Sequence, residues 1–164
     1  MGKSPIDRPT DRPINRKLYL IFAIVVLSLD QFTKYLIETN MSLHESFYVM
    51  PLLDIVSVRN VGSAFGLFKG LGNAVFITLA TLAVLALSGL IVFGKRDHFS
   101  LALLLGGALG NVTDRIVRGY VVDFLYFHVS RYYWPAFNVA DSALTVGIIL
   151  LIISQLKGTG HGTG

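Results

Sequence analysis

Cysteine is absent from the sequence of 164 residues, and histidine is rare. Without cysteine the chain can form no disulfide, thiolate nucleophile or cysteine-based metal site. The four histidines, at positions 44, 98, 128 and 161, lie far apart along the chain. They offer no close pair of ligands, so we expect no metal ion.

Charged residues are also few, at 15% of the chain, whereas 53% of the residues are hydrophobic. The mean hydropathy is +0.62. A soluble domain of this length needs more charge to cover its surface, so the composition indicates a protein that is solvated by a membrane. The net charge of +4 does not predict nucleic-acid binding, because the basic residues lie at the ends of segments. We therefore expect no nucleic-acid partner.

Four long apolar runs are present, and each has close to the roughly 20 residues that a helix needs to cross a membrane. They span residues 17–37, 73–93, 99–117 and 136–156. The sequence thus predicts an α-helical integral membrane protein with four transmembrane helices in a single domain over 17–156. The first run is too long for a signal peptide, and no clean cleavage site follows it. Residues 1–16 and 157–164 are expected to be flexible tails, the first of them basic.

Lysine and arginine predict the orientation of these helices. They concentrate in the N-terminal tail, in the connection that contains Lys95 and Arg96, and at Lys157 near the C-terminus. Basic residues beside transmembrane helices favour the cytoplasmic side. Both termini are therefore expected in the cytoplasm, and the loops 38–72 and 118–135 are expected to face outward.

The two outer loops contain β-branched and aromatic segments. Residues 47–51, 53–59 and 120–126 are typical of short strands and predict a small extracytoplasmic β-rich subdomain. The aromatic residues of 131–134 are typical of the membrane–water boundary. Residues 65–68 are expected to add another short segment or an interfacial anchor.

Several acidic side chains fall near the outer end of the predicted helices. Charges within a membrane helix cost several kcal/mol unless they are paired or solvated, so they usually mark a site. The acids at this level are Asp30, Asp114, Asp123 and Asp141. Asp30 and Lys34 lie four residues apart on one helical face. An ion pair at the end of the helix, with Lys34 reaching outward, explains these two equally well.

The third apolar run ends in a mixture of small and polar residues. Gly106 and Gly110 have the spacing that permits close packing of helices. Asn111, Asp114 and Arg115 share one helical face. We expect the adjacent charges of Asp114 and Arg115 to neutralise one another and to hold nearby groups in place.

Two asparagines lie at predicted turns. Asn60 ends a strand-like segment, where it can turn the chain and offer a donor and an acceptor, although a plain loop is the alternative. Asn138 fits the N-cap of the fourth helix, which puts Asp141 at the third helical position. Taken alone, Asp141 is best explained as a capping carboxylate stabilised by the helix dipole, and Asp123 as a loop acid.

Considered together, Asp123 and Asp141 indicate a catalytic site rather than two separate structural acids. Two carboxylates that lie close together cannot both ionise easily, so one of them keeps a proton. Such a dyad can take a proton from water and polarise a scissile carbonyl group. A serine–histidine mechanism with Ser142 and His128 is the alternative, but no nucleophile-elbow motif supports it. We expect the dipole of the fourth helix to favour the charged form of Asp141 and to leave the proton on Asp123.

From about residue 18 to residue 156, the chain resembles the bacterial lipoprotein signal peptidases, also called signal peptidase II. The resemblance rests on Asp30-Gln with Lys34 and on the segments 59–65 (RNVGSAF), 106–115 (GGALGNVTDR), 121–124 (VVDF) and 137–142 (FNVADS). Each motif is weak alone, but the order and spacing of the last three make the set specific. Arg59 and Ser63 depart from the pattern, which has a tyrosine-like residue and a small Ala or Gly there.

This resemblance implies four transmembrane helices with an outward β-rich platform, in the bacterial inner membrane, with the active site near the outer face. It implies an aspartic endopeptidase that removes the signal peptide from diacylglyceryl-modified prolipoproteins, cutting just before the lipid-modified cysteine. It implies no metal and no cofactor. Besides the substrate and membrane lipid, the antibiotic globomycin is expected to bind as an inhibitor, and the enzyme is expected to be a monomer.

The matching motifs also imply roles for single residues. The catalytic dyad is expected to consist of Asp123 and Asp141. The residues that bind substrate or support the dyad are expected to be Asn60, Asn111, Arg115 and Asn138. Structural positions around the site are expected at Asp30, Lys34 and Asp114.

Two other functional classes make different predictions. A small proton- or cation-coupled transporter needs an acid near the bilayer centre with access from both sides. Here the acids lie at one end, and run 73–93 has no charged residue. A structural or assembly subunit predicts that Asp123→Asn and Asp141→Asn unfold the protein or have no effect. A protease predicts folded variants that bind substrate and hardly cleave it.

Overall fold

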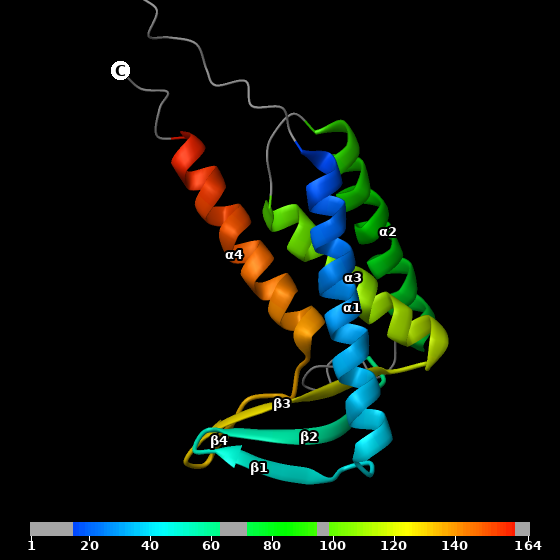
Figure 1. Ribbon diagram of the computed structural model, residues 1–164, viewed down its shortest axis with the longest axis vertical. Helices are drawn as coiled ribbons and strands as arrows, with labels where there is room; N and C mark the ends of the chain where they lie inside the picture. The colour runs from blue at the N-terminus through cyan, green and yellow to red at the C-terminus, as the bar shows by residue number, and fades with distance from the viewer. Residues whose placement is uncertain (1–14, 63–71, 95–98, 160–164) are drawn as a thin grey trace, which may run out of the picture.

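The structure is a computed structural model that describes residues 15–62, 72–94 and 99–159 of the chain. Its helices in this part of the chain are α1 (Arg16–Asn40), α2 (Gly72–Phe93), α3 (Phe99–Val117) and α4 (Val139–Thr159). An antiparallel sheet has the strand order β1-β2-β3-β4, with β1 (Ser46–Met50), β2 (Leu53–Asn60), β3 (Val121–Val129) and β4 (Tyr132–Tyr133). Figure 1 shows the sheet across one end of the helix bundle, with the start of α1 and the end of α4 at the opposite end.

The elements lie close to those that the sequence predicts. The predicted strands correspond to β1, β2 and β3, and the aromatic segment 131–134 contains the short strand β4. Helix α4 begins at Val139, within the apolar run 136–156, because the side-chain oxygen of Asn138 accepts a hydrogen bond from the Asp141 N–H and caps the helix there, as the sequence predicts. The helix then continues to Thr159, into the segment expected to be a loose tail. The expectation for 65–68 falls outside the described residues.

Three helices, namely α1, α2 and α4, are long and apolar enough to cross a membrane. The sequence predicts a fourth crossing at α3. The last turns of α3 carry Asn111, Asp114 and Arg115, which lower its mean hydropathy. Length and composition therefore support three membrane-crossing helices within the described part of the chain.

The helix α3 lies at the centre of the bundle, where it contacts α1, α2 and α4. Glycines allow this close approach. A Cβ atom on Gly106 would lie 2.7 Å from the Ala23 carbonyl oxygen of α1, and one on Gly107 would lie 2.6 Å from the Ala140 carbonyl oxygen of α4. The predicted close packing at Gly106 is therefore confirmed. As a result, the polar end of α3 is covered by protein.

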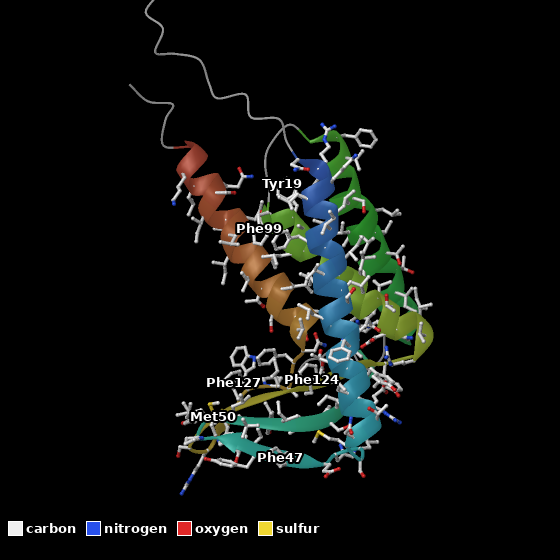
Figure 2. The ribbon with its side chains drawn as sticks, viewed as in Figure 1. Tyr19, Phe47, Met50, Phe99, Phe124 and Phe127 are labelled. Carbon is white, nitrogen blue, oxygen red and sulfur yellow. The ribbon has the colours of Figure 1, made fainter. Side chains whose placement is uncertain are left out.

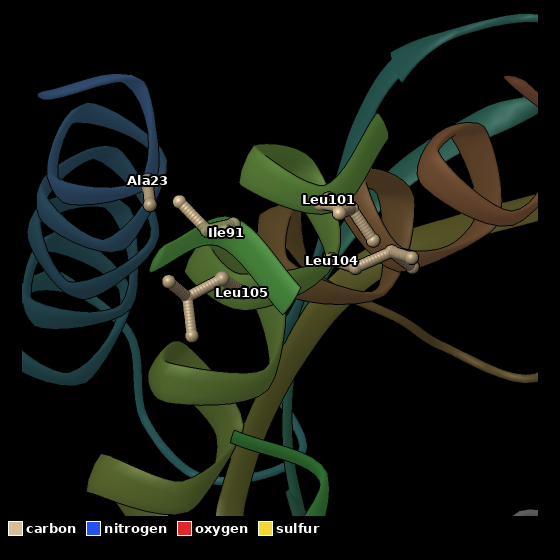
Figure 3. Packing of buried hydrophobic residues seen from close by; sticks show 5 residues of the cluster. All are labelled: Ala23, Ile91, Leu101, Leu104 and Leu105. Atoms are coloured by element: carbon tan, nitrogen blue, oxygen red, sulfur yellow. The ribbon is translucent and has the colours of Figure 1, made fainter. Parts of the chain in front are cut away.

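The apolar core joins three helices. Ala23 of α1, Ile91 of α2 and leucines of α3 form one buried cluster, as Figure 3 shows. The outer faces of the helices carry large apolar side chains that are more than half exposed in the isolated chain, such as Ile24, Leu79 and Ile152. An exposed apolar surface of this kind fits contact with lipid.

The sheet adjoins the bundle through β3. Figure 2 shows Phe124 and Phe127 on this strand at the sheet end, whereas Tyr19 and Phe99 lie toward the other end of the helices. Residues that follow β4 return along β3, because the Phe124 N–H and the Leu125 N–H both donate to the Phe137 carbonyl oxygen, at 3.0 and 2.8 Å. This return places the start of α4 directly beside β3.

Candidate active site

Asp123 and Asp141 lie on the same cavity, which has a volume of about 720 Å³. Asp123 belongs to β3 and is only 2% exposed. Asp141 lies in the first turn of α4. Since 17 residues separate them along the chain, the pairing depends on the return of the chain along β3 just before α4.

Asn138 joins the two acids. Its side-chain N–H donates to Asp123 Oδ1 at 2.7 Å, and its side-chain oxygen accepts from the Asp141 N–H at 2.9 Å. In return the Asn138 backbone N–H donates to Asp141 Oδ2 at 3.3 Å. This reciprocal pair is a capping box, so the predicted N-cap at Asn138 is confirmed. One fully buried residue thus contacts both carboxylates, that of Asp123 through its side chain and that of Asp141 through its backbone N–H.

The second oxygen of Asp123 faces β2. The side-chain N–H of Asn60 donates to Asp123 Oδ2 at 3.0 Å, and the Asn60 side-chain oxygen accepts from the Gly62 N–H at 3.0 Å. Burial raises the pKa of Asp123 to about 7, and the negative charge of Asp141 adds to this rise. The amide N–H groups of Asn60 and Asn138 act in the opposite direction, because they stabilise the ionised form. Near neutral pH, Asp123 is therefore able to hold a proton.

Asp141 has a different environment. The side-chain N–H of Asn111 donates to Asp141 Oδ1 at 2.7 Å, and Asp141 lies in the first helical turn, where the helix dipole favours a negative charge. The side-chain oxygen of Asn111 accepts from Lys34 Nζ at 3.1 Å and from Asn138 Nδ2 at 3.3 Å. Asn111 therefore links Asp141 to a cation on α1.

Arg115 projects from α3 toward the same cavity. Its guanidinium lies over the Phe76 ring at 5.4 Å and donates to the Asn111 carbonyl oxygen at 3.3 Å. Arg115 Nε is buried and has no hydrogen-bond partner among the described residues. Asp123 and Asp141 both act electrostatically on this guanidinium. The cavity therefore combines two carboxyl groups with one arginine.

Asp114 acts electrostatically on Arg115, as expected, but its ion pairs in the described part of the chain are with other residues. Asp114 pairs with Lys34 at 2.9 Å and also with Arg118. Neighbouring residues of a helix point in directions about 100° apart. Asp114 consequently faces α1, while Arg115 faces the cavity.

Lys34 does not reach outward, as the helix-end alternative predicted. Its side chain is 0% exposed and contacts Asp30 Oδ2 at 2.7 Å and Asp114 Oδ2 at 2.9 Å. Asp30 and Asp114 are equally buried. The close approach of α3 to α1 brings the second carboxylate within reach of Lys34, and pairing offsets the cost of burying the charges.

The serine–histidine alternative finds no support in the described residues. The Ser142 hydroxyl donates to the Asn138 carbonyl oxygen at 2.9 Å. His128 lies 3.5 Å from Asp54 across β2 and β3. In the described part of the chain, moreover, no cluster of three or more His, Cys, Asp or Glu side chains could hold a metal ion.

A family model described as signal peptidase (SPase) II matches residues 22–157. The chain belongs to the signal peptidase II family. It is therefore a protease of lipoprotein processing with membrane helices, and the transporter and assembly-subunit alternatives are set aside.

Individual relatives of this signal peptidase II are lipoprotein signal peptidases as well. The lipoprotein signal peptidase of Thermodesulfovibrio yellowstonii is 42% identical over 147 residues, which cover 86% of this chain and 97% of the relative. The lipoprotein signal peptidase of Cupriavidus taiwanensis is 43% identical over 146 residues, with 85% and 83% covered. A bacterial membrane enzyme solved by the in meso method at 2.3 Å resolution matches with a TM-score of 0.79 and 38% identity, over 90% of this chain and 92% of that one.

Several residues of this signal peptidase II that contact the predicted site residues were not identified from the sequence. Gln31 donates to Asp114 Oδ1 at 2.9 Å and to the Gly110 carbonyl oxygen at 3.1 Å. Arg118 joins Asp114 to Glu38 of α1. The spacing of four residues from Asp114 to Arg118 is a signal that could have identified this pair. Gln31 belongs to the motif Asp30-Gln, but its contacts with Gly110 and Asp114 were not predictable, because these partners lie about 80 residues away.

Proposed function

We propose that this signal peptidase II is an aspartic endopeptidase in which Asp123 and Asp141 activate water. Its proposed substrate is a diacylglyceryl-modified prolipoprotein, which it cuts just before the lipid-modified cysteine. The observation that carries the proposal is the shared cavity, in which Asn138 contacts both a buried Asp123 with a raised pKa and an Asp141 that lies in the first turn of α4. Different environments of two acids are the usual basis for acid and base roles.

In the proposed reaction, the Asp141 carboxylate takes a proton from water while the water oxygen attacks the scissile carbonyl carbon. The proton of Asp123 passes to the carbonyl oxygen, which forms a tetrahedral intermediate. The C–N bond then breaks, the leaving amine takes the proton from Asp141, and Asp123 recovers its proton from the hydroxyl group. No metal or cofactor takes part in this scheme.

Four further residues have proposed supporting roles. Asn60 and Asn138 donate to Asp123, and Asn111 donates to Asp141, so these three set the directions of the carboxyl groups. Arg115 contributes a positive charge at the cavity, where negative charge develops on the substrate oxygen. The structural positions proposed around them are Asp30, Lys34 and Asp114.

Apolar residues are proposed to receive the lipid-modified end of the substrate. Trp134, Pro135 and Phe137 line the cavity and also line an adjacent groove of about 750 Å³. The remainder of this groove is mostly aromatic and aliphatic, with Phe127, Val129 and two tyrosines. Acyl chains can remain in an apolar environment there while the peptide reaches the acids. Globomycin is proposed to bind in the same cavity.

The proposed placement has α3 crossing the bacterial inner membrane together with the other three helices. Both termini are then cytoplasmic, and the sheet and the cavity lie at the outer face. This is supported by the sheet at one end of the bundle and by the central position of α3, whose polar end is covered by its neighbours. The proposed enzyme works as a monomer with a single membrane domain, which reaches from α1 to the end of α4 at Thr159.

Lipid modification is expected to decide whether a precursor is cut. Purified enzyme is incubated with the same prolipoprotein in its diacylglyceryl-modified and unmodified forms, and the products are separated by mass. The modified form should be cleaved before its lipid-modified cysteine, and the unmodified form should remain whole. Equal cleavage of both forms would remove the proposed substrate class.

The activity is expected to fall as the pH rises above about 7, since the pKa of Asp123 lies near that value and the reaction needs its proton. Loss of one proton reduces the rate about tenfold for each further pH unit. Asn60→Ala removes a donor that stabilises the ionised form, so the decline should begin at a higher pH in this variant. A profile of kcat/KM from pH 5 to 9 measures both effects. An alkaline limb that stays in place in Asn60→Ala would contradict the assignment.

A further inference from the structure

A buried ion cluster on α1 and α3 lies behind the cavity. It consists of Asp30, Lys34 and Asp114, and each of these side chains is 0% exposed. Lys34 bridges the two carboxylates at 2.7 and 2.9 Å. Burying three charges is expensive, and an ion pair of this kind contributes little net stability compared with apolar packing. The cluster therefore needs an explanation other than stability.

The carboxylates of the cluster also reach the segments that carry the dyad. Asp30 Oδ1 accepts a hydrogen bond from the Ala140 N–H at 2.9 Å. Asp114 Oδ2 accepts one from the Val122 N–H at 3.1 Å. Ala140 directly precedes Asp141, and Val122 directly precedes Asp123. Each buried acid thus holds the backbone immediately before one dyad residue.

Lys34 connects these two attachments. Besides bridging Asp30 and Asp114, its Nζ donates to Asn111 Oδ1 at 3.1 Å, and Asn111 in turn donates to Asp141. The position of Asp30 has little freedom, because a Cβ atom on Gly110 would lie 2.5 Å from Asp30 Oδ2. Because Lys34 contacts both carboxylates, a change at Lys34 would affect both attachments.

We infer that Asp30, Lys34 and Asp114 are positioning residues that set the separation of the two dyad carboxylates, with Lys34 as the common link. The inference rests on the proposed function of Asp123 and Asp141. It goes beyond a general structural role, because it predicts effects on turnover and on the proton of the dyad. A misplacement of about 1 Å at a reacting group can cost about 100-fold in rate.

Asp30→Ala tests the geometric part of the inference. The variant loses the acceptor for the Ala140 N–H, so kcat should fall about 100-fold while KM changes little. Glu38→Gln is the matched control, because it removes another ion pair of α1, with Arg118 at 2.7 Å just after α3, and leaves the contacts of Ala140 and Val122 in place. The control should keep its kcat. An equal loss in both variants would overturn the inference.

Charge substitutions test the electrostatic part. The charged groups that act on Asp123 are Asp141 of α4, Arg115 of α3 and Lys34 of α1. Lys34→Met removes a positive charge and should move the alkaline limb of the pH profile to higher pH. Asp30→Asn keeps an acceptor but removes the negative charge that pairs with Lys34, so the positive charge of Lys34 acts on Asp123 with less compensation and the limb should move to lower pH. If Lys34→Met does not fold, the test rests on Asp30→Asn alone. An alkaline limb at the wild-type pH in Asp30→Asn overturns the inference.

A measurement without substrate separates this inference from the proposed function. The Asp123 carboxyl carbon is labelled with ¹³C, and its titration is followed by NMR in the wild type, Asp30→Asn and Glu38→Gln. If the pKa of Asp123 shifts in Asp30→Asn but not in Glu38→Gln, the positioning role is supported, whether or not the wild type cuts a prolipoprotein. A wild type that cuts no prolipoprotein would contradict only the proposed function. If the wild type cleaves its substrate but Asp123 titrates identically in all three proteins, only the inference is contradicted.

Discussion

Asp123→Asn and Asp141→Asn are each expected to yield a folded protein that binds lipid-modified precursor and hardly cleaves it. Asparagine has the shape of aspartate and keeps an oxygen acceptor, so the capping box at Asn138 and the contacts of β3 can persist. An amide cannot take a proton from water or deliver one to a carbonyl oxygen. The rate of cleavage should therefore fall at least about 1,000-fold in each variant.

The measurement is single-turnover cleavage of a diacylglyceryl-modified precursor, with binding followed separately by co-purification of the uncleaved precursor. Asp54→Asn is the control, because Asp54 lies on β2, pairs with His128 and does not line the cavity. This control should cut at the wild-type rate. Normal cleavage by either dyad variant would remove the proposed mechanism, and so would a loss in Asp54→Asn as large as in the dyad variants.

The double variant gives a further check on the dyad. Two residues that act as one unit have effects that do not add. Asp123→Asn combined with Asp141→Asn is therefore expected to be about as inactive as either single variant. A product of the two single losses would indicate independent roles.

Asn138→Ala is expected to have the next largest effect, because Asn138 serves both the helix and the dyad. The loss of the N-cap costs about 1 kcal/mol. The loss of the donor to Asp123 leaves a buried oxygen unsatisfied, which costs about 1–3 kcal/mol. The variant should unfold at a lower temperature and lose most of its activity, measured by thermal unfolding in detergent and by kcat/KM.

Asn138→Ser separates the two roles. Serine can still cap α4 through the Asp141 N–H, but its short side chain cannot reach Asp123 as the amide does. This variant should regain part of the stability that Asn138→Ala loses, without regaining activity. Full activity in Asn138→Ser would show that the contact from Asn138 to Asp123 is unnecessary.

Much of the fold could be predicted from local patterns. Runs of about 20 apolar residues predicted the four helices, and β-branched segments predicted β1, β2 and β3. The N-cap at Asn138 was predictable because capping depends on residues within one helical turn. The pairing of Asp114 with Lys34 was not predictable, since these two residues lie on different helices and far apart along the chain.

The sequence by itself determined the membrane character, the apolar helices, the strands and the family, because these depend on composition, periodicity and motif order. Only the tertiary structure decided the burial of Lys34, its pairing with Asp114, and the attachment of Asp30 and Asp114 to Ala140 and Val122. These contacts arise because glycines let α3 approach α1 and α4 closely. Contacts between segments about 80 to 110 residues apart depend on how the helices pack, and no local pattern encodes them.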